Sequence, residues 1–218
     1  IRMAGPFVGV HRDALIVAGG ANFPVPEGED LWEVPKIYHA DAWVLTRTGE
    51  EYVWKAGFKL KQPVGYGMCV STADGVVCLG GQTGETVFRD AFRLEWDAKE
   101  EALIQSPIPA LPNPLTGGAA ALIGDVVYVA GGQSGTGLGS ATKYFWRFDL
   151  AAEDGQWEKL PPWPGPERAF NQMVAQHNGR EMCLYLFGGR RQDTEVEGIE
   201  GIVPLSDVYE FSPARHRS

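Results

Sequence analysis

Leu15-Ile16-Val17-Ala18-Gly19-Gly20 is a short apolar run of strand-forming residues that ends in a pair of glycines. Three further runs have the same character and the same ending, at residues 76–81, 126–132 and 184–189. Branched and aromatic residues favour extended backbone, whereas a glycine pair lets the chain leave strand geometry. We therefore interpret the 218-residue chain as four copies of one unit built from β-strands.

Each run forms the second strand of a predicted β-hairpin. A second apolar segment precedes each run, and the connecting turn pairs are Arg12-Asp13, Asp74-Gly75, Gly124-Asp125 and Asn178-Gly179. A third, alternating strand follows, and its opening residues are Asp41, Asp90, Lys143 and Asp207. A fourth strand is marked in the first three copies by Trp54, Ile104 and Trp157. The pattern predicts four antiparallel strands per unit.

The spacing of the glycine pairs indicates the type of repeat. The pairs are 61, 51 and 57 residues apart, which is close to the roughly 50-residue kelch period and longer than the WD40 period. We predict an all-β, kelch-type β-propeller, a single domain over residues 1–218 with blades at approximately 1–57, 58–109, 110–163 and 164–218. A β-sandwich is the alternative. The fourth unit stops before its last strand, so we expect an incomplete ring.

Charge and composition limit the partners. The net charge of −9 and the isoelectric point near 5.0 argue against a nucleic-acid partner, which would need a concentrated basic face. The longest apolar runs are no longer than a strand, so we expect neither a membrane segment nor a signal-peptide core.

The cysteines and histidines indicate no metal site. Cys69, Cys78 and Cys183 each lie in an apolar run, which predicts buried thiols, although Cys69 and Cys78 flank one hairpin turn and could form a disulfide. The histidines lack the spacing to cysteines or carboxylates that metal ligands show; they are His11, His39, His177 and His216. We expect no structural zinc and no cofactor.

Hairpin geometry places several polar residues on one face of the predicted disc. The start of a blade's first strand and the end of its second strand lie at the same edge. The residues that follow the glycine pairs therefore surround one channel mouth, among them Asn22, Gln82, Gln133 and Arg190. Opposite them lie residues 4–6, 64–66, 116–118 and 167–170. The long loops 20–41 and 189–207 open on this face, where recognition is expected.

Two residues on this face suggest charge or proton transfer. Arg168 could bind an anionic ligand as a clamp, or it could form a salt bridge with a neighbouring blade. His39 could act as a general acid or base, or it could pack within the long loop.

The remaining candidates also have two interpretations each. Gln82 and Gln133 could bind substrate or satisfy loop backbone groups. Asn22 could bind substrate or tolerate a left-handed turn, and Tyr66 could present its hydroxyl on the channel wall or belong to the core. Arg190 is a second cation for an anionic ligand.

The residues of the first two units resemble a known family. Residues 4–7 and 16–24, which end in Gly19-Gly20-Ala21-Asn22-Phe23-Pro24, together with residues 38–41, are similar to the cyclically permuted members of the N-acetylneuraminate epimerase (sialic acid mutarotase) family. Residues 63–67, 77–81 and 89–92 share this resemblance, which runs over the whole chain. The Ala-Asn-Phe-Pro extension is its most specific element.

The resemblance implies six blades, of which four are present, and a bacterial protein of the periplasm or cytoplasm. It also implies that the remaining blades, or a second chain, complete the ring. The implied activity interconverts the anomers of N-acetylneuraminic acid, a sugar acid, by acid/base ring opening. The family's proposed catalytic glutamate has no matching position here. Gln82 stands where related sequences can carry Glu, and it is not a base.

A second function class fits the same fold. Kelch propellers can bind a protein or a glycan through their loops without any chemistry, so the alternative is a non-catalytic interaction module.

Overall fold

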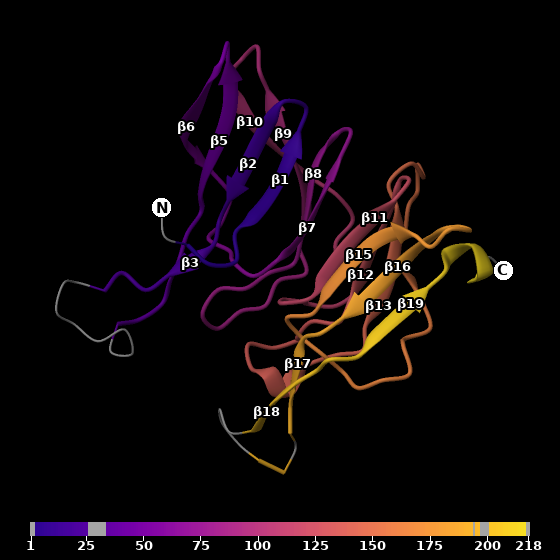
Figure 1. Cartoon of the computed structure of the whole chain (residues 1–218). Coiled ribbons are helices and arrows are strands. Elements are labelled where there is room, and N and C mark those ends of the chain that lie inside the picture. The colour runs from indigo at the N-terminus through magenta and orange to yellow at the C-terminus, as the bar shows by residue number, and fades with distance from the viewer. Residues whose placement is uncertain (1–2, 26–33, 194, 197–200, 217–218) are drawn as a thin grey trace.

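The computed structural model describes residues 3–25, 34–193, 195–196 and 201–216, and their regular secondary structure is almost entirely β-strand. Figure 1 shows the strands gathered into four successive antiparallel sheets, which confirms the all-β propeller. Blade 1 has the order β1-β2-β5-β6, and its strands are β1 (Phe7–His11), β2 (Ala14–Ala18), β5 (Asp41–Thr48) and β6 (Glu51–Lys59). Blade 2 contains β7 (Met68–Thr72), β8 (Gly75–Leu79), β9 (Ala91–Asp97) and β10 (Ala102–Pro107).

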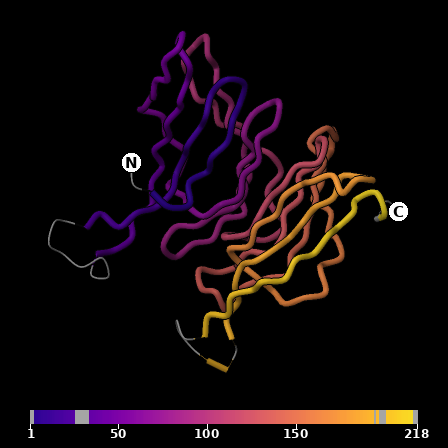
Figure 2. Tube along the Cα trace, viewed as in Figure 1, coloured from indigo at the N-terminus to yellow at the C-terminus, as the bar shows by residue number. Residues whose placement is uncertain are grey.

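Blades 3 and 4 repeat this plan with shorter outer strands. Blade 3 contains β11 (Ala119–Ile123), β12 (Val126–Ala130), β13 (Phe145–Asp149) and β14 (Glu158–Lys159). Blade 4 has three strands among the described residues, which are β15 (Gln172–His177), β16 (Met182–Phe187) and β19 (Val208–Phe211). Two 3-10 turns complete the structure, η1 (Leu138–Ser140) and η3 (Pro213–His216). Figure 2 shows the chain passing through the four sheets in order.

The innermost strands β1, β7, β11 and β15 lie beside one another in this sequence. Alternate residues of each blade face the next blade, so an apolar core fills each of the three junctions. Phe7 packs edge-on against Phe92 between blades 1 and 2, with the ring centroids 5.5 Å apart. Leu79 and Val129 belong to the core between blades 2 and 3, and Phe145 and Leu184 to that between blades 3 and 4.

The backbone conformation at these junctions requires the glycine pairs. All eight glycines have positive φ angles, between 59° and 102°, which residues with a Cβ rarely adopt. The second glycine of the first three pairs donates its N–H to a carbonyl of the next blade. The bonds run from Gly20 to Val64 (2.7 Å), from Gly81 to Leu115 (2.9 Å) and from Gly132 to Arg168 (2.8 Å). The repeated motif therefore joins blade to blade.

The structure corrects one detail of the sequence alignment. The first glycine of each pair donates its N–H to a backbone carbonyl at the start of the third strand or directly before it. The accepting residues are Asp41, Asp90, Tyr144 and Asp207. In blade 3 the equivalent of the aspartates is therefore Tyr144, not Lys143. The loop of blade 3 that precedes Tyr144 contains η1.

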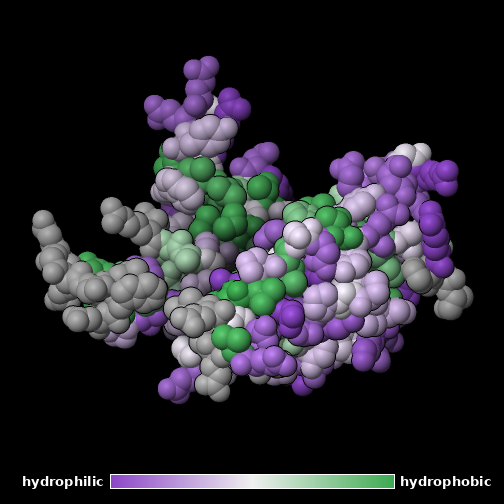
Figure 3. All heavy atoms as spheres, turned by 60° about the horizontal axis from the view of Figure 1, so that its bottom comes forward, coloured by the Kyte–Doolittle hydropathy of each residue, from purple (hydrophilic) through white to green (hydrophobic). Residues whose placement is uncertain are grey.

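Both ends of the row of blades expose apolar side chains. Val8 and Val10 of β1 are 46% and 49% exposed, and Val174 and Val208 of blade 4 are 46% and 63% exposed. Trp54, which marks the fourth strand of blade 1, is 53% exposed. Figure 3 shows apolar surface on the lobe that blade 1 forms. The cores fill the junctions between blades, and these outer faces have no blade against them among the described residues.

The cysteines and the helical segments complete the description. Cys69 and Cys78 pair directly across β7 and β8, but both are free thiols, and burial raises the pKa of each. Cys183 is also free and buried.

Within the described ranges, no helix has the length and apolarity needed to cross a bilayer.

Candidate functional site

Four equivalent bridges define the edge of the propeller where the polar candidates lie. Each joins the residue after a glycine pair to the start of the same blade, and the pairs are Ala4 with Ala21, Gly65 with Gln82, Thr116 with Gln133, and Ala169 with Arg190. In blades 1 and 4 the long loops continue from this edge as two-stranded ribbons, β3 (Ala21–Asn22) with β4 (Ile37–Tyr38) and β17 (Arg190–Gln192) with β18 (Ile202–Pro204). Figure 1 shows both ribbons at the lower side of the molecule. We call this edge the mouth.

The blade 1 ribbon brings Asn22 and His39 together. His39 Nε2 lies 2.8 Å from Asn22 Oδ1, so this nitrogen carries a proton and donates it to the amide oxygen. The other ring nitrogen, Nδ1, lies 3.9 Å from a carboxylate oxygen of Asp41. The His39 side chain is 26% exposed and so is accessible from solvent. Asn22 therefore holds the imidazole in one orientation.

Two tyrosines connect this ribbon to blade 2. Gln82 Nε2 donates to the hydroxyl of Tyr38 at 3.0 Å, and the Tyr38 and Tyr66 rings meet edge-on with centroids 6.3 Å apart. Lys36 Nζ donates to the Tyr66 hydroxyl at 3.3 Å. Two groups of contacts thus lie at the mouth of blades 1 and 2: Asn22 with His39, and Gln82 with Tyr38 and Tyr66, where Gln82 contacts Tyr38 rather than open space.

Sequence reasoning did not assign a role to Lys36 or Tyr38. Both lie near the end of the long loop 20–41, and only the pairing of Asn22 with Ile37 in the ribbon brings them to the mouth. The one available signal was the proximity of Tyr38 to His39 in the chain.

The remaining mouth candidates differ in exposure. Gln133 is buried at 2% exposure, and its N–H donates to the carbonyl of Thr116. Arg190 is exposed, and its guanidinium lies 4.2 Å from the centroid of the Phe170 ring. Arg190 is therefore a cation on the surface of the mouth, whereas Gln133 contributes to its frame.

Arg168 is fully buried and already paired. Its guanidinium donates to both carboxylate oxygens of Asp207, at 2.8 and 2.7 Å, and to the carbonyl of Gly188 at 2.9 Å. The rings of Trp163 and Tyr209 lie 5.4 and 5.3 Å from it. Of the two interpretations that the sequence leaves open, this geometry matches the ion pair, which forms within blade 4. The alignment of the repeats indicates that Arg168 is buried, because the equivalent positions in blades 2 and 3 hold the buried residues Val64 and Leu115.

The partners of Asp207 determine its charge state. The hydrogen bonds from Arg168 hold the pKa of Asp207 at about 2, and the Tyr209 hydroxyl adds a further bond of 2.6 Å. The same bond to Asp207 raises the pKa of Tyr209. Asp207 is therefore a carboxylate at neutral pH with three donors directed at it, and it is not available as a base.

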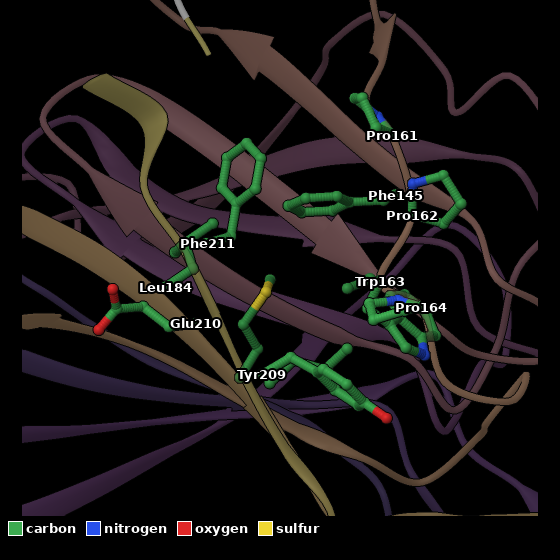
Figure 4. Close-up of a pocket in the computed structure, with 12 residues that line it drawn as sticks. Phe145, Pro161, Pro162, Trp163, Pro164, Leu184, Tyr209, Glu210 and Phe211 are labelled. Atoms are coloured by element: carbon green, nitrogen blue, oxygen red, sulfur yellow. The ribbon is translucent and has the colours of Figure 1, made fainter. Parts of the chain in front are cut away.

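An apolar pocket lies away from the mouth, between blades 3 and 4. Figure 4 shows that Phe145, Trp163 and three prolines face Tyr209 and Phe211 across it. The pocket has a volume of about 210 Å³, and its wall includes Trp163 and Tyr209, the two rings that flank Arg168. Its carboxylate, Glu210, has no cationic partner among the pocket-lining residues, so the pocket offers little chemistry.

In the parts of the chain that the structure describes, no three His, Cys, Asp or Glu side chains gather closely enough to hold an ion.

The chain is similar to proteins of one family. Residues 108–217 match the family model described as N-acetylneuraminate epimerase. The N-acetylneuraminate epimerase of Pasteurella multocida (strain Pm70) is 42% identical over 108 residues, and that of Haemophilus influenzae (strain PittEE) is 37% identical over 107. Each match covers 49% of this chain and 24% of the relative, so it spans about a quarter of the relative's length.

A solved structure supports the fold over nearly the whole chain. The structure entitled "Structure of YjhT" superposes with a TM-score of 0.69 and 13% identity, covering 96% of this chain and 68% of the other. At this identity the likeness concerns the fold alone. The family model, however, matches half of the chain. On these grounds, the chain belongs to the N-acetylneuraminate epimerase family.

Proposed function

We propose that the protein interconverts the α and β anomers of N-acetylneuraminic acid, and that the substrate binds at the mouth. The observation that carries this proposal is the convergence of His39, Tyr38 and Tyr66 at one edge of a chain that belongs to the epimerase family. Each of these side chains can take up or release a proton. Backbone bridges of all four blades lie along this edge.

Mutarotation requires one proton to leave the anomeric hydroxyl and one to reach the ring oxygen. The Nε2–H of His39 donates a hydrogen bond to Asn22 Oδ1. In the neutral ring, Nδ1 therefore keeps a lone pair that can accept the proton of the anomeric hydroxyl. Asp41, 3.9 Å away, would stabilise the imidazolium that results.

The tyrosines can supply the second proton. The Tyr38 hydroxyl accepts a hydrogen bond from Gln82, and the Tyr66 hydroxyl accepts one from Lys36, so each keeps its own proton free to donate. Gln82 cannot take up a proton. The proposal therefore assigns any additional carboxylate base to residues outside this chain, as the family resemblance implies.

The test is proton NMR of N-acetylneuraminic acid freshly released as the α anomer by a sialidase. The protein should speed the loss of the α signal, and His39→Gln should slow the catalysed rate about 10²-fold. His177→Gln is the matched control, because His177 ends β15 at the opposite end of the hairpin from the mouth. A decay no faster than the spontaneous one would refute the proposal. Tight sugar binding without exchange would instead favour the interaction module.

A further inference from the structure

One residue in each blade adopts left-handed backbone geometry at the mouth. These residues are Gly5 (φ 60°), Tyr66 (φ 59°), Gly117 (φ 61°) and Phe170 (φ 55°). The last three each donate their N–H to the carbonyl of the equivalent residue in the preceding blade, from Tyr66 to Gly5 at 2.7 Å, from Gly117 to Tyr66 at 2.8 Å and from Phe170 to Gly117 at 2.6 Å. The four residues form a hydrogen-bonded arc, which we call the mouth arc.

The mouth arc alternates glycine with an aromatic residue. A Cβ atom built on Gly5 would lie 2.6 Å from Cδ1 of Tyr66, and one built on Gly117 would lie 3.3 Å from Cε1 of Phe170. Each aromatic ring therefore lies over the glycine before it. An aromatic residue with positive φ has a strained backbone. Strain of this kind is concentrated at active sites and ligand-binding sites. Phe170 is 39% exposed, so burial does not compensate for its strain.

Each aromatic ring of the mouth arc carries a cation. The guanidinium of Arg190 lies 4.2 Å from the Phe170 centroid. Lys36 Nζ lies 5.1 Å from the Tyr66 centroid and 5.0 Å from that of Phe23. Both cationic residues are exposed. Among the residues that the structure describes, no carboxylate forms an ion pair with either of them, in contrast to Arg168.

An aromatic face attracts a cation without neutralising it, so the charge stays available to an anion. We propose that the pairs Lys36–Tyr66 and Arg190–Phe170 form a two-point site for the carboxylate and the ring of a sugar acid. Lys36 and Arg190 supply the positive charge that attracts the carboxylate, and Tyr66 and Phe170 are positioning residues that hold these cations and pack against the apolar C–H face of the sugar. This inference rests on the proposed function for the class of ligand.

The experiment compares binding of N-acetylneuraminic acid with binding of its neutral methyl ester, by calorimetry at constant salt. Lys36→Gln and Arg190→Gln should each raise the Kd for the acid about tenfold and change the Kd for the ester less than twofold. Arg191→Gln is the matched control, because neighbouring residues of the β17 strand point to opposite faces. Equal losses for acid and ester, or unchanged binding of the acid, would overturn the inference.

Phe170→Gly separates a positioning role from a structural one. Glycine relieves the left-handed strain, so the denaturation midpoint should stay the same or rise, while the Kd for the acid rises several-fold. A fall in the midpoint with unchanged binding would make Phe170 structural and contradict the inference.

The two proposals fail in different ways. Charge-dependent binding without anomer exchange would refute the proposed catalysis and support the proposed binding site. Exchange by a protein whose Lys36 and Arg190 variants bind normally would remove the binding site alone. If the protein bound no N-acetylneuraminic acid, both would be wrong.

Discussion

Two arginines of blade 4, Arg168 and Arg190, start from neighbouring backbone and have opposite environments. Arg168 directly precedes Ala169, and Ala169 is bridged to Arg190. Arg168 is buried with both ends of its guanidinium on Asp207, whereas Arg190 is exposed on the face of Phe170. Arginine is suited to both tasks, because it forms bidentate carboxylate pairs and also stacks on aromatic rings.

The difference teaches that position at the mouth does not decide the role of a side chain. Successive residues along extended backbone point to opposite sides. Arg168 occupies the position at which Val64 and Leu115 fill the earlier junctions, so its side chain enters the core and must bring a counter-ion there. Arg190 starts a ribbon that lies outside the blades, and its charge stays in solvent.

The largest expected effect comes from breaking the buried pair. Arg168→Leu should lower the free energy of unfolding by about 3 kcal/mol, because it leaves the Asp207 carboxylate without its cation. Guanidinium denaturation followed by tryptophan fluorescence measures this. The double variant with Asp207→Asn should recover part of the loss. A stable Arg168→Leu protein that had lost only sugar-acid binding would reverse the assignment of the two arginines.

A smaller effect on stability is expected at low pH. The pKa of Asp207 is held at about 2 in the folded protein, below the usual value near 3.8. The stability that this carboxylate contributes is therefore complete above about pH 4 and is lost as the pH falls towards about 2. Urea midpoints between these values should fall more steeply for the wild type than for Asp207→Asn. Parallel curves would show that the pair does not stabilise the fold.

The smallest effect is expected at the exposed arginine. Arg190→Gln should change the free energy of unfolding by less than about 0.5 kcal/mol, because no described carboxylate depends on it. The same denaturation experiment applies. A loss comparable to that of Arg168→Leu would mean that the stacked pair with Phe170 is part of the fold.

Much of the fold and of the mouth could be predicted because the signals are local. A hairpin is set by its turn and by the alternation of its strands, so reflecting each hairpin about its turn placed residues 64–66 opposite Gln82 and residues 167–170 opposite Arg190. The structure has the bridges Gly65–Gln82 and Ala169–Arg190 there. The error at Lys143 arose where a loop of different length follows the glycine pair. Lys36 was missed because a long loop has no such period, and its course depends on the ribbon that it forms.

The sequence by itself determined the repeat, the four sheets and the edge at which the glycine pairs end, since strand alternation and turn chemistry act over a few residues. The tertiary structure decided which side chains enter the junctions and which remain in solvent. Those choices depend on contacts between residues distant in the chain: within blade 4, Arg168 pairs with the carboxylate of Asp207, 39 positions further on, and Arg190 lies on the ring of Phe170. Desolvation costs therefore separated two arginines that the sequence presents as equals.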